Sequence, residues 1–238
     1  MIRERFFFRE TIATILADEP AYIGAAKRGI LGARQALERY IARDPFFRTT
    51  FDPYEPDSDE PVIVRMAEAA KKASVGPMAA VAGTIAWAGI DEMVDRGAQF
   101  GVIDNGGDIA LINQVRPVRV GIHAGTSPFS GRVAFLIAPR STIHGICTSS
   151  ATVGPSISFG IADAVTVFSG NPALADAWAT AICNRIRKDD RTVLSELDRS
   201  EVTGVFAILG DHTERWGDLP PLVRANVDDR LISAGDRL

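Results

Sequence analysis

The chain has 238 residues, of which 46% are hydrophobic and 24% are charged, as is typical of a globular protein with one large core. Its formal net charge of -4 at pH 7 disfavours nonspecific nucleic-acid binding, because that binding depends on Lys and Arg side chains that neutralise phosphates. Two cysteines are too few for a disulfide framework, and no apolar run is long enough for a membrane span, so we expect a cytoplasmic protein. Without an obvious linker, residues 1–238 are expected to form a single domain.

The N-terminal part predicts strands followed by a long helix. The aromatic and β-branched stretch Phe6–Leu16 is typical of one or two short strands. Apolar residues then recur at helical spacing over Ala21–Arg43, and Asp44 with Pro45 ends this pattern. Because Asp52–Pro61 is rich in Pro and acidic residues, we expect an exposed loop there.

Two further helical segments are expected before the first hairpin. Val62–Ser74 favours a helix, or a short strand that runs into one. Small residues dominate Ala79–Trp87, in a helix that is expected to continue to about Arg96. A helix of this composition can lie close to a ligand or another backbone, but composition alone favours a tightly packed internal helix.

A series of short apolar runs and turns follows. Gln99–Asp104 and Ile109–Asn113 flank the segment Asn105-Gly106-Gly107-Asp108, and an Asn-Gly turn between apolar runs is typical of a β-hairpin. Val118–His123 and Arg132–Ala138 are further expected strands. Successive strands between long helices predict an α+β fold, with a largely antiparallel sheet flanked by helices.

The segment His144–Ile186 holds most of the residues that bear chemistry. A turn of small residues is expected at Cys147–Ser150, followed by a Gly/Pro/Ser loop over residues 154–160 and a strand over Ala162–Phe168. Asn171 fits the N-cap of a helix that comes next.

Asp176 and Thr180 lie one turn apart on one face of that expected helix. Their two hard oxygens suit Mg²⁺, which commonly binds one or two carboxylates together with ligand phosphates. On spacing alone, a solvated acid and a threonine bonded to its own helix are the favoured explanation, but the alanines around the pair leave almost no bulk there and so favour a ligand site more than spacing does. Asp163, at the start of an apolar strand, is expected to be paired, solvated at the strand end, or functional.

Other reactive side chains give weaker signals. His144 and Cys147 are close in sequence, but a catalytic thiol needs a base placed in space, so an inert buried Cys147 is favoured. Cys183 is expected in the core, and His123 is expected to be structural or to contact a ligand, because no second metal ligand lies at a suitable spacing. The sequence contains no GxSxG turn, P-loop or dinucleotide-binding fingerprint.

Several short motifs occur in a distinctive order between Gly76 and Asn184. They are Asn105-Gly106-Gly107-Asp108-Ile109, Val120-Gly121-Ile122, Thr148-Ser149-Ser150, Ala162-Asp163-Ala164 and Ala175-Asp176-Ala177-Trp178-Ala179-Thr180-Ala181. This order resembles the FAD:protein FMN transferases of the ApbE family, and the last motif is similar to the family's ADAxxTA helix. The resemblance implies a T-fold-like domain that binds FAD, cleaves its pyrophosphate with Mg²⁺ and attaches FMN to a Thr or Ser of a target protein.

The resemblance also implies roles for particular residues. Asp176 and Thr180 would be catalytic residues and Mg²⁺ ligands, and a backbone carbonyl between Ala79 and Gly83 would complete the metal site. The residues implied to contact the flavin nucleotide are Asn105, Gly106, Gly107, Asp108, Thr148, Ser149, Ser150 and Asp163.

The chain departs from the transferase pattern in two segments. Ala80-Val81-Ala82-Gly83 stands where the family usually has Lys-Gly, and only Val153–Phe159 stands where the transferases carry a His-Ile-Ile-Asp-Pro-x-Thr-Gly motif. In these respects the chain resembles a compact cytoplasmic branch of the family, some members of which are linked to sulfur assimilation.

Three functional hypotheses follow. The first is a flavin-binding protein that uses FAD or FMN and Mg²⁺, cleaves the FAD pyrophosphate or transfers FMN to an acceptor protein, and acts apart from nucleic acids and membranes. The second is a noncatalytic accessory or scaffold protein with a vestigial nucleotide pocket, for which the sulfur link would give the pathway. The third is a hydrolase or transferase that acts through Cys147. A sheet-based domain with many small-residue faces is also compatible with a homodimer.

Overall fold

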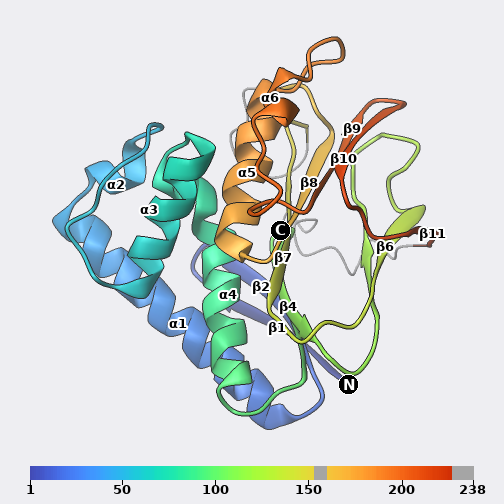
Figure 1. Cartoon of the computed structure of the whole chain (residues 1–238). Helices are drawn as coiled ribbons and strands as arrows, with labels where there is room; N and C mark the ends of the chain where they lie inside the picture. Colours follow the sequence, from blue (N-terminus) through green and yellow to red (C-terminus); the bar gives the residue numbers. More distant parts are fainter. Residues whose placement is uncertain (153–159, 227–238) are drawn as a thin grey trace.

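The computed structural model describes residues 1–152 and 160–226 (Figure 1). Its main feature is an eight-stranded sheet with the order β1-β2-β3-β4-β7-β8-β9-β10, in which every neighbouring pair is antiparallel. The strands are β1 (Ile2–Phe8), β2 (Thr11–Ala17), β3 (Phe100–Asn105), β4 (Asp108–Asn113), β7 (His144–Ser149), β8 (Ala164–Ser169), β9 (Gly204–Leu209) and β10 (His212–Gly217). The predicted α+β class and antiparallel sheet are confirmed.

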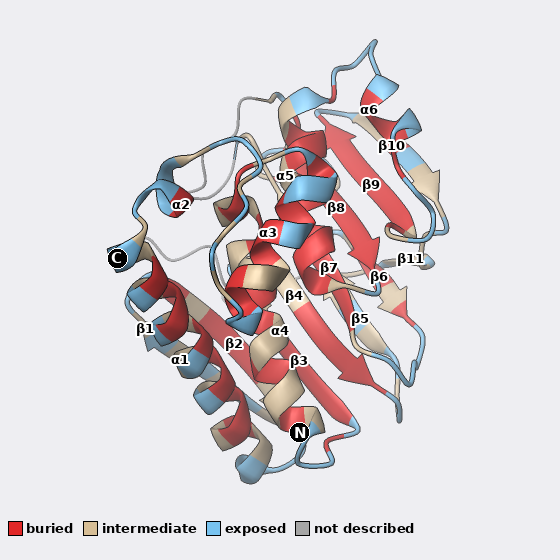
Figure 2. Ribbon diagram, turned by 60° about the vertical axis from the view of Figure 1, so that its left-hand side comes forward, coloured by how far each residue is buried: buried red, intermediate tan, exposed pale blue. Residues whose placement is uncertain are grey.

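All the longer helices lie on one face of this sheet (Figure 2). They are α1 (Pro20–Arg43), α3 (Pro61–Ala73), α4 (Val81–Val94) and α5 (Pro172–Arg185), and the short helices are α2 (Phe46–Thr49), the 3₁₀ turn η1 (Pro77–Ala80) and α6 (Thr192–Ser195). Helix α4 packs on β3 and β4, α5 packs on β7 and β8, and α1 lies against α4. A small sheet with the order β11-β6-β5 packs against the opposite face through a second hydrophobic core. Its strands are β5 (Val118–Gly121), β6 (Val133–Ile137) and β11 (Leu222–Arg224).

Strand β7 shows how the two faces differ. Its residues alternate, so that Gly145 and Cys147 face the helices while His144 and Ile146 face the second core. A Cβ atom at Gly145 would lie 2.5 Å from the Cα atom of Pro172, so only glycine lets α5 approach this closely.

The start of α5 follows the sequence prediction. The Asn171 side chain accepts a hydrogen bond of 3.1 Å from the N–H of Leu174, and Pro172 occupies the first helical position. The predicted cap is therefore confirmed, and Asp176 and Thr180 lie on this helix as expected.

Several predicted boundaries need correction. The hairpin turn consists of Gly106 and Gly107, which have φ values of 72° and 106°, whereas Asn105 and Asp108 belong to the paired strands. The expected turn at Cys147–Ser150 is wrong, because residues 147–149 continue β7 and pair with β8 on one side, with Cys147 also paired to β4. The ambiguous segment Val62–Ser74 is the helix α3.

Other predictions fall outside these elements. The loop expected over residues 154–160 lies almost entirely outside the described residues.

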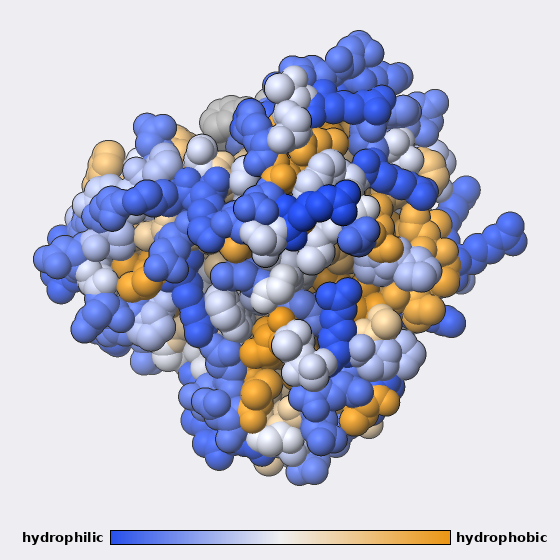
Figure 3. All heavy atoms as spheres, in the orientation of Figure 1, coloured by the Kyte–Doolittle hydropathy of each residue, from blue (hydrophilic) through white to orange (hydrophobic). Residues whose placement is uncertain are grey.

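No single helix in residues 1–152 and 160–226 has the length and apolar composition of a membrane span. Helix α3 and residues 77–94 reach that length and composition only when they are taken together, and they meet at an angle of 106°. On the side seen in Figure 1 the surface is largely hydrophilic, with hydrophobic patches over α4 and near β6 and β10 (Figure 3).

Candidate functional site

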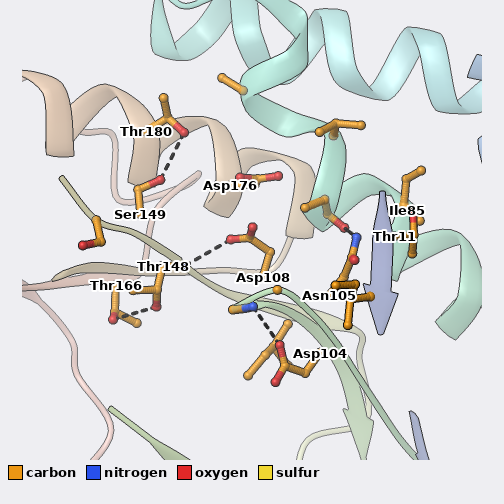
Figure 4. A pocket seen from close by; sticks show the side chains of 18 of the residues that line it. Thr11, Ile85, Asp104, Asn105, Asp108, Thr148, Ser149, Thr166, Asp176 and Thr180 are labelled. Carbon is orange, nitrogen blue, oxygen red and sulfur yellow. Dashed lines mark hydrogen bonds between the residues drawn. The ribbon is translucent and has the colours of Figure 1, made fainter. Parts of the chain in front are cut away.

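A cavity of about 2230 Å³ is lined by residues of the β3–β4 turn, the end of β7, the start of α4 and one side of α5 (Figure 4), and also by residues of α1, β5 and β6. Nine of the ten residues implied by the family resemblance line it: Asn105, Gly106, Gly107, Asp108, Thr148, Ser149, Ser150, Asp176 and Thr180. The structure therefore brings together side chains from three sequence segments that are far apart.

Asp176 lies at the contact between α4 and α5, with only 5% of its surface exposed. Its Oδ2 atom accepts a 2.8 Å hydrogen bond from the N–H of Gly83, in the first turn of α4. A Cβ atom at Gly83 would lie 2.6 Å from the carbonyl oxygen of Pro172, so a larger residue would force the two helices apart. Burial and the Asp108 carboxylate raise the pKa of Asp176 well above its usual value, while the N–H groups of Gly83 and Ala82 act in the opposite direction.

Asp108 faces the same space from the start of β4. Burial, together with the nearby Asp104 carboxylate, raises its pKa to about 7, against the lowering effect of a 3.2 Å hydrogen bond that its Oδ1 accepts from the N–H of Thr148. Cys147 lies beside the two acids without any exposed surface, and its Sγ atom donates to the carbonyl of Pro172. Burial and, to a smaller extent, the Asp108 carboxylate raise the pKa of the Cys147 thiol well above its usual value. Cys147 is therefore a protonated buried thiol rather than a nucleophile.

The hydroxyl groups of the cavity pair with one another. Thr180 Oγ1 and Ser149 Oγ are 3.2 Å apart, and Thr148 Oγ1 and Thr166 Oγ1 are 2.9 Å apart (Figure 4). Ser149 thus ties the end of β7 to the face of α5 that carries both candidate metal ligands.

Backbone carbonyls at the start of α4 are partly engaged already. The side-chain amide of Asn105 donates to the carbonyl of Ala82 at 3.1 Å, and the Thr84 hydroxyl donates to the carbonyl of Ala80 at 2.6 Å. Asn105 therefore has a visible structural role, holding the β3–β4 hairpin against α4.

Asp163 does not line the cavity, but it is hydrogen-bonded to Thr152, which does. Its Oδ1 atom accepts a hydrogen bond of 3.0 Å from the hydroxyl of Thr152, and its Oδ2 atom accepts one of 2.6 Å from the N–H of Gly210. Of the three options that the sequence left open for Asp163, the structure shows the first, a carboxylate with hydrogen-bonding partners.

Sequence reasoning missed some residues of this site. Asp104 Oδ1 accepts a 2.8 Å hydrogen bond from the N–H of Gly107 and so braces the turn, a role that an Asp three residues before a glycine could have suggested. Thr166 lies opposite Thr148 in the neighbouring strand, and nothing in its apolar surroundings in the sequence marks it. Thr152 also lines the cavity and was not singled out.

A second part of the cavity is apolar with a charged rim. Leu37, Ile41, Met78 and Ile85 line it, and Arg9, Arg34 and Arg48 lie at its edge. Arg34 is paired with Glu10 and Glu38, so its charge is largely compensated. These apolar side chains can contact an apolar group bound in the cavity.

The oxygen donors near Asp176 fit Mg²⁺ in type, although no group of three acidic, His or Cys side chains arranged as metal ligands occurs in residues 1–152 and 160–226. The Asp108 carboxylate contributes to raising the pKa of Asp176, so the two acids lie close enough to repel each other when charged. The Thr180 and Ser149 hydroxyls lie alongside. A divalent cation held by Asp176 would offset this repulsion, which is otherwise relieved by protonation.

The sheet, its one-sided helices and the cavity together define an ApbE-like protein, as solved structures show. The apo form of the flavinyl transferase ApbE from Pseudomonas stutzeri superimposes with a TM-score of 0.57 at 13% identity, over 99% of this chain and 98% of that one. The flavin transferase ApbE from Vibrio cholerae gives a TM-score of 0.54 at 13% identity, over 90% and 96%. At this identity the likeness establishes the fold.

The chain belongs to the family described as AbpE bacteria, whose sequence model matches residues 9–205. Its relatives include UPF0280 proteins of Methanoregula boonei, 64% identical over the full length of both chains, and Methanosphaerula palustris, 60% identical over 99% of each. A UPF0280 protein of Methanosarcina acetivorans is 46% identical over 98% of this chain and 93% of its own. The resemblance read from the motifs is confirmed.

Proposed function

We propose that this protein binds FAD in the cavity and, with Mg²⁺, cleaves the pyrophosphate so that FMN is transferred to a protein hydroxyl. The observation that carries the proposal is the convergence of Asp176, Asp108 and Thr180 on one side of a cavity in an ApbE fold. The solved ApbE structures are described as flavin transferases, and this chain shares their fold.

The pyrophosphate would lie between the glycine turn and α5. Gly106 has open space where a side chain would stand, so a phosphate can approach the backbone there. Asp176 and Asp108 would repel a bare pyrophosphate, so binding here requires a cation, which Asp176 and Thr180 would hold. Bound there, Mg²⁺ would neutralise charge on the phosphate oxygens during phosphoryl transfer.

The apolar part of the cavity suits the flavin ring. Ile41, Met78 and Ile85 present branched or flexible apolar side chains of the kind that usually contact aromatic ligands. An extended dinucleotide could then reach from this part to the acids at α5, which matches a cavity much larger than one ring requires.

A noncatalytic accessory role is the second candidate, and one observation favours it. Asp176 accepts a hydrogen bond from the N–H of Gly83, and the Thr180 hydroxyl is hydrogen-bonded to that of Ser149. Both candidate metal ligands therefore already have hydrogen-bonding partners within the protein. In this alternative the cavity binds a nucleotide without cleaving it.

The test is FAD binding and cleavage by purified protein with and without Mg²⁺. We expect Mg²⁺ to tighten FAD binding, measured by quenching of flavin fluorescence, and AMP to appear on chromatography. Asp176→Asn keeps the side-chain shape and should weaken the Mg²⁺-dependent affinity by about tenfold or more, which corresponds to about 1.4 kcal/mol. Asp189→Asn is the matched control, because Asp189 is exposed and outside the cavity.

Equal FAD affinity in wild type and Asp176→Asn, with and without Mg²⁺, would overturn the metal assignment. Tight FAD binding without release of AMP would favour the accessory role over the transferase.

A further inference from the structure

Thr152 has the hydrogen-bonding arrangement of an activated alcohol. Its hydroxyl donates to Asp163 Oδ1 at 3.0 Å, and the other oxygen of that carboxylate is fixed by the N–H of Gly210 at 2.6 Å. A hydroxyl, a base and a group that orients the base are the three parts that a nucleophilic alcohol requires.

This arrangement distinguishes Thr152 from the other hydroxyls of the cavity. Thr148 and Thr180 pair with the hydroxyls of Thr166 and Ser149, and neither of these partners is a base. Thr49 and Thr50 donate to backbone carbonyls. Among the cavity hydroxyls whose donor contacts lie within the described residues, Thr152 is the one that donates to a carboxylate.

The position of Thr152 suits attack on a ligand in the cavity. It lines the same cavity as Ser149 and Asp176, three residues beyond the end of β7. Its own N–H donates to Ser150 Oγ at 3.1 Å, which anchors the backbone next to the hydroxyl. Asp163 stands behind Thr152, outside the cavity lining, where it can take a proton without occupying the space of the ligand.

We propose that Thr152 is itself an acceptor of FMN, so that the protein flavinylates its own chain. This inference rests on the proposed function, because the same FAD and the same Mg²⁺-dependent cleavage are needed. The Thr152 Oγ1 atom forms a bond to the FMN phosphorus, and the bond from that phosphorus to the bridging oxygen breaks. AMP leaves with the bridging oxygen, and the hydroxyl proton passes to Asp163 and then to solvent. The product is a threonine phosphoester of FMN.

The experiment uses the full-length chain incubated with FAD and Mg²⁺, then denatured and washed free of unbound flavin. Intact mass spectrometry should show one added FMN less one water, and fragmentation should place it on Thr152. Thr152→Val should lose the adduct, whereas Thr152→Ser should keep it because the hydroxyl remains. Asp163→Asn should slow adduct formation by about 100-fold, within the usual range for removing a general base.

Thr126→Val is the matched control, because Thr126 is exposed and does not line the cavity, and it should form the adduct at the wild-type rate. Release of AMP without an adduct, or an adduct on another residue in the wild type, would overturn the role of Thr152 and leave the proposed function standing. Failure to cleave FAD at all would overturn both, and the AMP assay separates the two failures.

Discussion

Around β7 and β8, the two faces of the eight-stranded sheet differ in the size of the side chains packed on them. On the helix-covered face, Gly145 and Cys147 of β7 lie under α5, and five of the eleven buried residues of α5 are alanines. On the other face, the Phe135 ring stands 4.8 Å from the ring centre of Phe168 and 5.5 Å from that of Phe206, in edge-to-face contacts. Backbones therefore meet directly on the first face, whereas aromatic rings separate them on the second.

This difference explains how Asp176 is buried where α4 and α5 meet. A backbone N–H of α4 can reach the Asp176 carboxylate only because Gly83 has no side chain at the helix contact. Close backbone packing buries the acid beside the cavity, whereas the ring contacts of Phe135, Phe168 and Phe206 keep the backbones further apart on the opposite face. The comparison implies that the helix face tolerates added volume poorly and that the aromatic face tolerates modest reshaping.

The largest effect is expected from adding a single methyl group on the helix face. Gly145→Ala places a Cβ atom 2.5 Å from the Cα atom of Pro172, which only movement of α5 can relieve. We expect a loss of about 3 kcal/mol in the free energy of unfolding, at the upper end of usual overpacking costs. Urea unfolding followed by circular dichroism measures it.

The control for this variant is the same change in a helix that has space. Gly32→Ala, on the exposed side of α1, meets no atom within 4 Å and should raise the free energy of unfolding by about 0.5–1 kcal/mol. Similar losses at Gly145 and Gly32 would contradict the close-packing explanation.

A smaller effect is expected from reshaping the aromatic face. Phe135→Leu keeps an apolar side chain of similar volume and loses the edge contacts with Phe168 and Phe206, at an expected cost of about 1–1.5 kcal/mol. The same urea experiment applies. If this variant proves less stable than Gly145→Ala, the proposed contrast between the two faces is wrong.

The smallest effect concerns a polar group within the aromatic face. His144 is 5% exposed, its Nδ1 lies 3.2 Å from the Thr142 carbonyl, and its Nε2 has no partner among the described residues, beside a cavity of about 20 Å³. Burial lowers the pKa of His144, so the unfolded chain binds its proton more readily.

The stability that depends on neutral His144 is therefore complete above about pH 6.5 and is lost as the pH falls toward the lower pKa of the folded state. We expect the urea midpoint of the wild type to fall between pH 7.5 and pH 5.5 by more than that of His144→Phe. Identical pH dependence in both proteins would show that His144 does not contribute to acid sensitivity.

Local patterns made much of the fold predictable. Helical spacing identified α1, the Asn-Gly-Gly segment identified the β3–β4 hairpin, and Asn171 marked the start of α5. These signals are local because a helix or a tight turn is determined largely by residues within a few positions of one another. No helix or strand was predicted after Ile186, although Gly204–Leu209 is an apolar run that suits a buried strand.

The contacts that build the site were less predictable. Gly83 and Asp176 are 93 positions apart, and Asp163 and Gly210 are 47 apart, so no local spacing reveals either hydrogen bond. The motif order indicated which residues would gather around the cavity. It did not reveal that Asp176 accepts a hydrogen bond from the first turn of α4, or that Asp163 accepts one from Thr152.

The strand order has a consequence for how the chain folds. Strand β2 pairs with β3 across residues 18–99, a segment that contains four α-helices and the 3₁₀ turn η1. Closing so long a loop costs conformational entropy before the strand contacts repay it, so we expect folding to be slow for a protein of this size. During synthesis the β1–β2 hairpin, with Phe6, Phe8 and Ile15, has its inner edge unpaired until β3 has left the ribosome. This early hairpin is the part of the nascent chain most exposed to pairing with the wrong partner.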